Sequence, residues 1–350
     1  MKNQSLTPYS PPALSETDQE ALTDLYVRGT PENTLRAYER DLLYITAWRE
    51  AVFGGPPDWP EREEVALRFL LDHARDLADA TATDSARQAA EVLIDMGLRK
   101  SLACPAPATL DRRIASWRAF HRMKNLESPF DAPILKQARA KARRAAARPR
   151  KAKSEHPITR EVLEAMLKTC SHGLRDTRDR ALLMLGWASG GRRRSEITAL
   201  RLEDVSLKEF TSKGLIWIRL LETKTTAKGE APRLVLKGRA AEALAYWIEV
   251  APITDGYLFR PVSRTGDALE RGLSPDAVRQ IVKRRLRLAG FDESFASPHG
   301  LRSGFLTQAA LDGAPIQAAM RLSLHRSMAQ AQRYYDDVDV AENPATDLLG

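Results

Sequence analysis

The sequence predicts a mainly helical protein of two domains, an N-terminal helical bundle and a C-terminal α+β domain with a small β-hairpin. The 350 residues leave room for two domains of ordinary size, each with its own core. Apolar residues recur at steps of three and four in most of the chain, which is the spacing of one helical face. The best strand candidate is one apolar run, residues 215–221.

The first half of the chain is predicted to be helical behind a short tail. Residues 1–16 are rich in Ser and Pro, lack the apolar core of a signal peptide and are expected to be flexible. Thr30 is a plausible helix cap, followed by Pro31 in the first turn. One face of that helix is formed by Leu35, Tyr38, Leu42, Ile45 and Trp48. With further helices near 61–77, 84–97 and 109–124, residues 17–135 are predicted to form an all-α bundle.

Residues 136–155 are expected to form a basic helical end and then a basic linker, which opens at Arg148-Pro149-Arg150. The first eighteen of these residues, KQARAKARRAAARPRKAK, contain no acidic and no large apolar residue. A solvated linker and a strap that follows the phosphates of a polyanion explain this composition about equally well. The candidate phosphate-binding side chains are Lys136, Arg139, Lys141, Arg143, Arg144, Arg148, Arg150, Lys151 and Lys153.

The second domain is predicted to span residues 156–337, followed by a C-terminal tail, residues 338–350. Thr159 can cap its first helix, and a second helix follows in RDRALLMLGWA. The strand at 215–221 turns and returns through PRLVL, which predicts a β-hairpin. Further helices are expected near 238–250, 275–289, 300–312, 315–324 and 327–336.

Charge and cysteine content narrow the class of protein. The chain has 54 Lys and Arg against 46 Asp and Glu, and this excess of positive charge favours a polyanionic partner. Cys104 and Cys170 are far apart and lack ligand spacing, so neither a disulfide framework nor a zinc site is expected, and a reducing cytoplasm fits. No apolar run approaches the length that crosses a membrane.

Three arginines follow two glycines in GGRRRSE, residues 190–196, at an expected helix start. Guanidinium groups bind phosphate oxygens in a bidentate manner, and helix N-terminal amides add to the attraction. Glu196 lies three residues after Arg193 and could orient it. The segment therefore predicts an anion site, although an exposed basic turn is the simpler interpretation.

Two further motifs are weak by themselves. In SPHGLRSGF, His299 and Arg302 are three residues apart and share a face at a helix start. Such a pair recurs by chance, and a lone histidine is more often structural than catalytic. Lys224 is expected at the hairpin tip, where a lysine is usually solvated but can also reach into a groove and deliver a proton.

The stretch LHRSMAQAQRYYDD places Tyr334 nine residues after His325. Nine residues on one unbroken helix would put the two on opposite sides, but Ser327 is a good N-cap, so the chain is expected to turn between them. Both side chains could then face one pocket. A stripe of Met328, Ala331 and Tyr335 assigns Tyr335 to packing and leaves Tyr334 about 100° away around the helix. The simpler interpretation is that both tyrosines are core or surface residues.

Taken together and in order, these motifs resemble the tyrosine recombinase, or phage integrase, family. The resemblance rests on G-x-R-x-S-E at residues 191–196, the hairpin lysine, H-x-x-R at 299–302, then a histidine and a tyrosine nine residues later. It covers residues 156–337 strongly. The segment TPENTLRAYERDLLYITAW, residues 30–48, looks like part of the family's core-binding domain.

The chain departs from the family pattern at three places. Arg192 stands where the family usually has an apolar residue, and Arg193 is chosen among three arginines by its spacing to Glu196. Leu324 stands where the family usually has glycine. The lysine loop lacks the commonest glycine-flanked form, so Lys228 remains an alternative to Lys224.

The resemblance implies a site-specific DNA recombinase that cleaves and rejoins DNA through a 3′-phosphotyrosine, with strand exchange between two sites. The implied catalytic residues are Arg193, Lys224, His299, Arg302, His325 and Tyr334, supported by Glu196. Tyr334 would be the nucleophile, and Arg193 and Arg302 would clamp the two non-bridging phosphate oxygens. No metal or other cofactor is implied.

The remaining roles and the partners also follow from the resemblance. His325 would donate a hydrogen bond to the phosphate, Lys224 would protonate the leaving 5′-oxygen, and His299 would act as a base or orient the phenol. The DNA would carry inverted half-sites, held by a clamp of two domains and the basic linker, and a homotetramer would join two sites. The C-terminal tail would contact a neighbouring subunit or fray.

Three other functions remain open. A type IB topoisomerase uses the same tyrosine chemistry but relaxes DNA without pairing two sites. A DNA-binding protein could keep the fold without cutting, although every catalytic element is present. A metal-dependent DDE transposase is less favoured, because no acidic triad stands out. The target sequence and any accessory proteins cannot be inferred from the residues.

Overall fold

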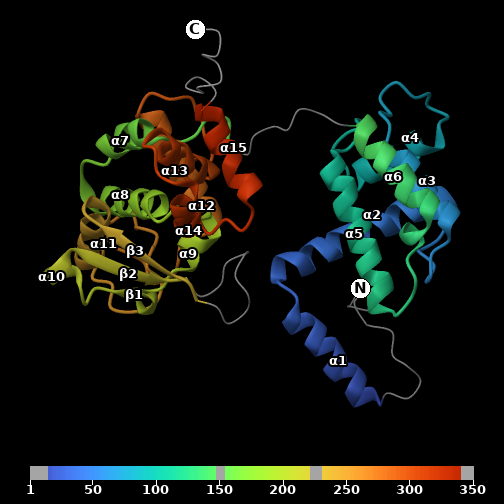
Figure 1. The fold of residues 1–350 in the computed structure, drawn as a ribbon. Coiled ribbons are helices and arrows are strands. Elements are labelled where there is room, and N and C mark those ends of the chain that lie inside the picture. Colours follow the sequence, from blue (N-terminus) through green and yellow to red (C-terminus); the bar gives the residue numbers. More distant parts are fainter. Residues whose placement is uncertain (1–14, 147–153, 221–230, 340–350) are drawn as a thin grey trace, which may run out of the picture. The chain divides into compact units, whose positions relative to one another are not determined.

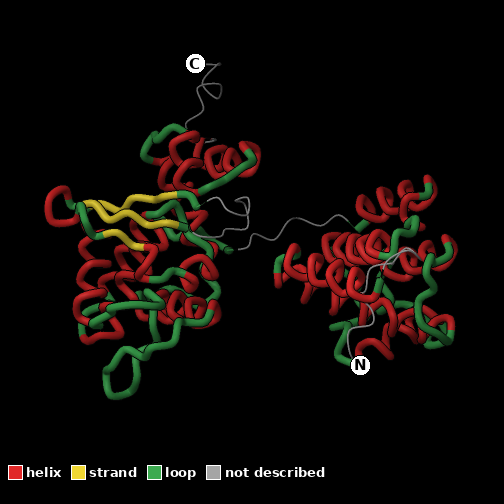
Figure 2. The backbone as a smooth tube through the Cα atoms, turned by 90° about the horizontal axis from the view of Figure 1, so that it is seen from below, coloured by secondary structure: helices red, strands yellow, loops and turns green. Residues whose placement is uncertain are grey.

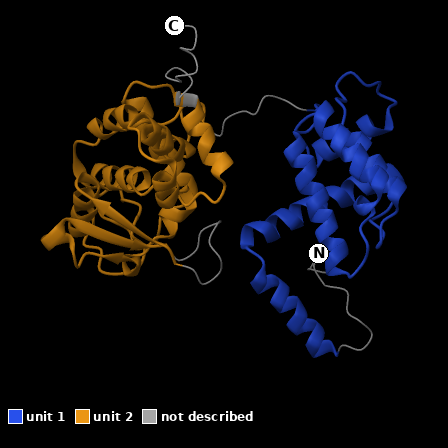
Figure 3. Ribbon diagram, in the orientation of Figure 1, with its two compact units in different colours: residues 1–149 blue, residues 150–350 orange. Residues whose placement is uncertain are grey.

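The computed structural model describes residues 15–146, 154–220 and 231–339, which divide into two compact units, residues 1–149 and 150–350 (Figure 3). Both units are mainly helical, and the described strands all lie in the second (Figures 1 and 2). Across the described ranges, no helix is long and apolar enough to cross a membrane. The mainly helical fold with one small antiparallel sheet, as predicted, is confirmed.

Within residues 15–146, the first unit contains one short 3₁₀ turn, Pro129–Asp131, and six helices: α1 (Glu16–Gly29), α2 (Glu32–Phe53), α3 (Glu63–His73), α4 (Ser85–Asp95), α5 (Pro107–Met123) and α6 (Pro133–Ala145). Helix α1 was not anticipated and begins inside the expected tail, where Ser15 and Asp18 form a capping box. Pro31, not Thr30, is the residue that precedes α2. Helix α6 includes the basic helical end that was expected at the start of residues 136–155.

Aromatic rings fill the core of this unit. The Trp48 ring packs edge-to-face on Phe69 at 4.9 Å, and Phe69 packs on Trp117 at 5.3 Å. Ile45 and Trp48 are buried as the helical spacing predicts, but Leu35 lies one turn into α2 and is only partly covered. The buried indole of Trp48 donates to the Asp72 carboxylate at 3.1 Å, which satisfies its N–H group away from water.

The second unit contains nine described helices of at least four residues: α7 (Arg160–Lys168), α8 (Gly173–Ala188), α9 (Arg194–Ala199), α10 (Phe210–Lys213), α11 (Arg239–Val250), α12 (Pro275–Leu288), α13 (His299–Leu311), α14 (Ile316–Ser323) and α15 (Met328–Asp339). Its sheet has the order β1 (Val205–Ser206), β2 (Leu215–Arg219) and β3 (Arg233–Lys237), antiparallel throughout. The predicted hairpin is therefore present, and β1 adds a third strand that was not anticipated.

Alternation along the hairpin fixes which sheet face meets the core. Ile216 pairs with Leu236 and Ile218 with Leu234, and all four side chains are buried. Helices α8 and α11 pack against each other beside this face. Residues 181–185 of α8 are buried without a break, because this helix is covered on all sides rather than on one stripe.

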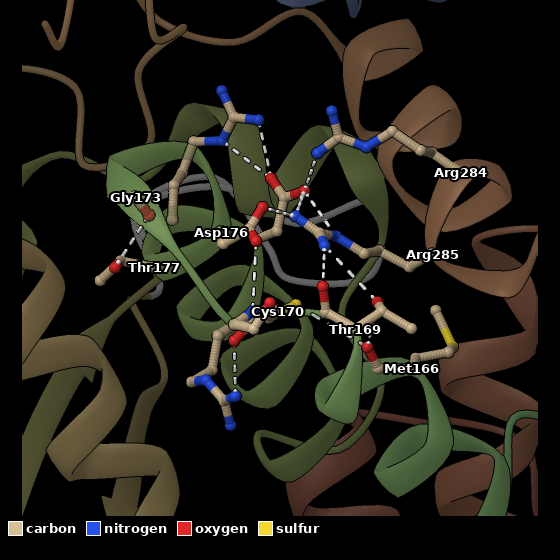
Figure 4. A network of polar contacts seen from close by, with 12 residues as sticks. Met166, Thr169, Cys170, Gly173, Asp176, Thr177, Arg284 and Arg285 are labelled. Atoms are coloured by element: carbon tan, nitrogen blue, oxygen red, sulfur yellow. Dashed lines mark hydrogen bonds and ion pairs between the residues drawn. The ribbon is translucent and has the colours of Figure 1, made fainter. Parts of the chain in front are cut away.

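A buried network of charged groups joins α8 to α12 and to the end of α7 (Figure 4). The fully buried carboxylate of Asp179 is surrounded by three arginines: Arg178, Arg284 and Arg285. Arg285 also donates to the Thr169 carbonyl at 2.7 Å and binds Asp176. Buried ions need this degree of pairing to offset their lost hydration, so the network fixes where α12 lies relative to α8.

A glycine turn, residues 189–193, connects α8 to α9 and passes between two other elements. Gly190 and Gly191 have φ of +94° and +72°, the left-handed region that favours glycine. A Cβ atom on Gly191 would lie 2.2 Å from Cα of Arg302 in α13, and one on Gly190 would lie 2.3 Å from the carbonyl carbon of Leu322 in α14. Backbone therefore touches backbone at this junction, and neither position has room for a side chain.

Replacing Gly191 with alanine is expected to destabilise the protein by about 3 kcal/mol or more, through unfavourable φ and a forced shift of α13. Gly214→Ala is the matched control, because its φ is +66° and no atom lies within 4 Å of the added Cβ. We expect it to cost only about 1 kcal/mol. Urea unfolding of both variants measures the difference, and equal losses would contradict the tight junction.

Candidate active site

Predicted site residues from separate parts of the second unit surround one cavity of about 380 Å³. Five arginines line it, namely Arg192, Arg193, Arg194, Arg279 and Arg302, together with His299. They come from the glycine turn and α9, from α12 and from the start of α13. Among the described residues, two carboxylates form ion pairs with these arginines. Glu196 pairs with Arg192 and Arg193, and Asp276 on α12 pairs with Arg279. The cavity is thus a positively charged site that fits an anion.

Arg302 lies at the centre of the cluster and is 3 % exposed. Its Nη1 donates to the Gly191 carbonyl at 3.1 Å, and its Nη2 donates to Nδ1 of His325 at 3.1 Å. Burial, with repulsion from Arg192 and Arg193, lowers the pKa of Arg302 to about 10. The group is still a cation at neutral pH, held in place by backbone.

Arg193 is oriented by Glu196, as the spacing in the sequence suggested. Its Nη1 donates to Oε1 of Glu196 at 2.5 Å, and its backbone N–H donates to Oε2 at 3.2 Å. The carboxylate is buried, whereas the Arg193 side chain keeps about 30 % of its surface exposed. One edge of the guanidinium is therefore fixed while the group still reaches the cavity.

His325 follows a sharp turn at the end of α14. Leu324, the residue before it, has φ of +54°, which explains why glycine would suit this position. The Oγ of buried Ser323 lies 2.8 Å from Nδ1 of His325. Because a guanidinium can only donate, the contact from Arg302 makes Nδ1 an acceptor, and the proton of the neutral imidazole is then on Nε2.

The two adjacent tyrosines have different environments, and α15, which carries them, packs against α13 (Figure 1). Tyr335 is buried with Ala331, and its hydroxyl donates to the Ala314 carbonyl at 3.0 Å, so it is a packing residue as expected. Met328 was assigned to the same stripe, but it opens the helix and is exposed. The Tyr334 hydroxyl instead lies 3.5 Å from Nε2 of His299.

Several predicted residues fall outside the described ranges. Lys224 and its alternative Lys228 belong to residues 221–230, and Arg148, Arg150, Lys151 and Lys153 belong to residues 147–153. Of the basic residues on α6, Arg139 and Arg143 both pair with Asp111 of α5. Lys136, Lys141 and Arg144 are exposed, and no ion pair holds them within the described part of the chain.

Sequence reasoning missed three residues of this site. Arg279 lies on α12, and no motif links it to the others. Ser323 stands two residues before His325 and could have been noticed only from that spacing. Arg192 was noted as a departure, but its burial was not foreseen, because an arginine among three arginines looks solvent-exposed in a sequence.

The imidazole of His325 is predicted to make the protein less stable in mild acid. Burial, followed by the charges of Arg302, Arg193, Arg192 and His299, lowers its pKa to about 4. The unfolded chain, with an ordinary histidine pKa of about 6.5, takes up this proton first, so stability falls as pH drops from about 6.5 toward 4.

Because His325 is partly exposed, we expect it to contribute about 1 kcal/mol to the loss of unfolding free energy between pH 6.5 and pH 4.5, about half of what the full pKa shift would give. Denaturant unfolding of the wild type and of His325→Gln at both pH values isolates this contribution. Parallel losses in the two proteins would show that His325 is not held neutral by its surroundings.

Comparison with known proteins agrees with this geometry. Residues 157–340 match the model of the phage integrase family. An integrase/recombinase XerD homolog of Selenomonas ruminantium is 27 % identical over 332 residues, 92 % of this chain and 86 % of the relative. The tyrosine recombinase XerD of Xanthomonas campestris pv. campestris is 26 % identical over 93 % of this chain and 89 % of its own length.

Solved structures show the same fold. A lambda integrase dimer bound to a COC′ core site aligns over 93 % of this chain and 95 % of the matched chain, with a TM-score of 0.53 and 16 % identity. The Tn1549 transposon integrase in complex with a circular intermediate DNA gives a TM-score of 0.54 at 14 % identity, over 89 % of this chain and 92 % of the other. With more than half of its residues inside the family match, the chain belongs to the phage integrase family and is a tyrosine-type site-specific recombinase.

Proposed function

We propose that this chain cleaves and rejoins duplex DNA at specific sites through a 3′-phosphotyrosine on Tyr334. The observation that carries the proposal is the position of the Tyr334 hydroxyl, 3.5 Å from Nε2 of His299, which itself lines the arginine-rich cavity. A phenol next to a possible proton acceptor and to fixed cations has what attack on a phosphodiester requires.

The chemistry needs no high-energy cofactor. The phenolic oxygen attacks the scissile phosphorus, the bond from phosphorus to the 5′-oxygen breaks, and a 5′-hydroxyl leaves. A phenol has an unperturbed pKa of about 10, so transfer of its proton toward His299 would assist the attack at neutral pH. Attack of a 5′-hydroxyl on the phosphotyrosine reverses the step, because one phosphodiester is exchanged for another.

Fixed positive charge would stabilise the transition state. Arg193 and Arg302 bind the two non-bridging oxygens in this proposal, and the Nε2–H of His325 donates to one of them. These roles are supported by contacts that hold each group in place. Glu196 binds Arg193, the Gly191 carbonyl binds Arg302, and Ser323 contacts His325. Donors already oriented toward developing charge do not have to reorganise during the reaction, which is usually the largest catalytic effect.

A general acid is still required for the leaving 5′-oxygen. Lys224 is proposed for this role and Lys228 remains the alternative, since both lie in the segment that connects β2 to β3. Substituting each in turn and restoring the rate with a 5′-phosphorothiolate substrate, whose sulfur leaves without a proton, would identify the acid. Rescue is expected for Lys224→Ala and not for Arg302→Ala.

DNA binding is proposed to use both units, with two protomers on inverted half-sites and four on a pair of sites. One of the similar structures is a dimer bound to a core site, which supports two protomers per site. The basic face of α6 and the linker beyond it would contact phosphates, and the tail after residue 339 would contact a neighbouring subunit. Such a protein would act in the cytoplasm, where the DNA lies.

The target site can be recovered first, by binding the purified protein to fragmented genomic DNA and sequencing what it retains. A nicked duplex carrying that site then traps the covalent intermediate, because the short cleaved strand diffuses away. Exchange between two labelled sites tests recombination, and supercoil relaxation without exchange would instead indicate a topoisomerase.

On this trap, Tyr334→Phe is expected to bind DNA within about three-fold of the wild type and to form no covalent adduct, since it lacks the nucleophile. Tyr335→Phe is the matched control. It loses the hydrogen bond to the Ala314 carbonyl, worth about 1 kcal/mol, and should still form the adduct. An adduct in Tyr334→Phe that disappears in Tyr335→Phe would reverse the assignment.

Exposed charge on α6 should control the salt dependence of binding. If Lys136, Lys141 and Arg144 contact phosphates, changing all three to glutamine lowers the slope of log Kd against log salt by roughly 0.9 for each contact. Changing Arg139 and Arg143 instead should lower it less, because Asp111 already binds both. Fluorescence anisotropy between 50 and 300 mM salt, roughly the range over which such contacts weaken, measures both slopes. An unchanged slope in the first variant would remove α6 from the interface.

A further inference from the structure

Arg192 is the least exposed of the five arginines that line the cavity. Its side chain is 1 % exposed, and its Nη2 donates to the Leu322 carbonyl at 2.7 Å and to the Gly190 carbonyl at 3.4 Å. Its Nη1 lies 3.6 Å from Oε2 of Glu196. Within the described residues, its Nε atom is buried without a hydrogen-bond partner.

Burying this charge is unfavourable in itself. The Arg192 guanidinium loses its hydration here. Among the described residues, the carboxylate it pairs with is Glu196, which also binds Arg193. Arg302 lies close enough for each positive charge to oppose the other. An apolar side chain of similar length would fill the same space without this cost, so the cation at this position calls for a role other than stability.

The partners of Arg192 join the glycine turn to the end of α14. Leu322 is in the last turn of α14, Ser323 ends the helix, and Leu324 then reverses the chain into His325. The glycine turn touches the same peptide, because a Cβ on Gly190 would lie 2.5 Å from the backbone nitrogen of Ser323. Arg192 therefore holds the backbone three residues before His325, next to the serine that contacts its ring.

Arg192 is not placed to bind the phosphate itself. The Nη2 atom is used by backbone carbonyls, the Nη1 atom faces Glu196, and almost none of the side chain reaches solvent. Arg193 and Arg302 line the same cavity, and Arg302 is nearly as buried as Arg192. The partners differ: Arg302 contacts the His325 ring, whereas Arg192 donates to the Leu322 carbonyl at the end of α14. Of these three arginines, Arg192 is thus the one that contacts the α14 backbone.

We propose that Arg192 is a positioning residue: its guanidinium holds the end of α14 against the glycine turn and so sets where the His325 imidazole meets the scissile phosphate. The inference rests on the proposed function for its effect on rate. It also has a consequence in the free protein, because Arg192 is one of the charges around the ring. The others are Arg302 and His299 on α13 and Arg193 on the glycine turn, with Ser323 as the uncharged neighbour.

The main test uses Arg192→Met, which keeps the length and removes the donors and the charge. Under saturating DNA, we expect adduct formation on the nicked duplex to slow by at least about ten-fold while the Kd changes by less than about three-fold. Arg192→Lys keeps the charge but lacks the planar guanidinium, so its rate of adduct formation should lie between those of the wild type and Arg192→Met. It also serves if the methionine variant does not fold.

A double-mutant cycle separates positioning from general stability. If Arg192 acts through His325, then Arg192→Met adds little to the loss already caused by His325→Ala, so the double variant is about as slow as the slower single one. Arg178→Met is the control, since it removes another buried guanidinium from the same unit, one that binds Asp179 and the Arg260 carbonyl. Any factor by which Arg178→Met slows adduct formation should multiply with the factor for His325→Ala in the double variant.

A readout without DNA completes the design. The His325 ring can be assigned among the six histidines by comparing NMR spectra of the wild type and His325→Ala. Its titration should move to higher pH in Arg192→Met, because a nearby cation is lost and the ring becomes less enclosed. It should not move in Arg178→Met.

The outcomes are distinct. A multiplicative cycle, or an unmoved His325 titration in Arg192→Met, would overturn the positioning role even if the wild type forms its adduct. Absence of any adduct in the wild type would overturn the proposed function instead, and the titration would still decide whether Arg192 holds the His325 turn.

Discussion

The contact of the glycine turn with its two neighbours is the constraint on which the site depends. Gly190 and Gly191 bring the backbone between α8 and α9 directly against α13 on one side and the end of α14 on the other. The Gly191 carbonyl accepts from Arg302, and the next residues supply Arg192 and Arg193. Groups from distant parts of the sequence thus reach one cavity because three pieces of main chain meet with no side chain between them.

The positive charges that line the cavity are only partly neutralised by the carboxylates paired with them. Arg192 and Arg193 share the carboxylate of Glu196, and burial lowers the pKa of both Arg192 and Arg302. The fold therefore holds these guanidinium groups close together although they repel one another, and a bound anion would reduce that repulsion.

The order of motifs allowed much of the fold and of the candidate site to be predicted. Helical spacing separated Tyr335 from Tyr334, and the gap to Glu196 singled out Arg193, because both inferences concern neighbours within one helix or turn. Arg279 could not be found, since its place in the cavity depends on how α12 packs. The two-residue strand β1 is too short to leave an alternating pattern, and it forms because β2 offers it a partner edge.

The packing of α15 on α13 places Tyr334 beside His299 within one folded unit of one chain. Tyr334 and the side chains proposed to cradle the phosphate belong to one folded unit of one chain, joined through His299. No second copy has to lend a hydroxyl to complete the set. Under the proposed function, two inactive variants mixed together, one lacking the Tyr334 phenol and one lacking the Arg302 guanidinium, would therefore be unable to restore each other's activity, because each chain would bring both groups to its own half-site.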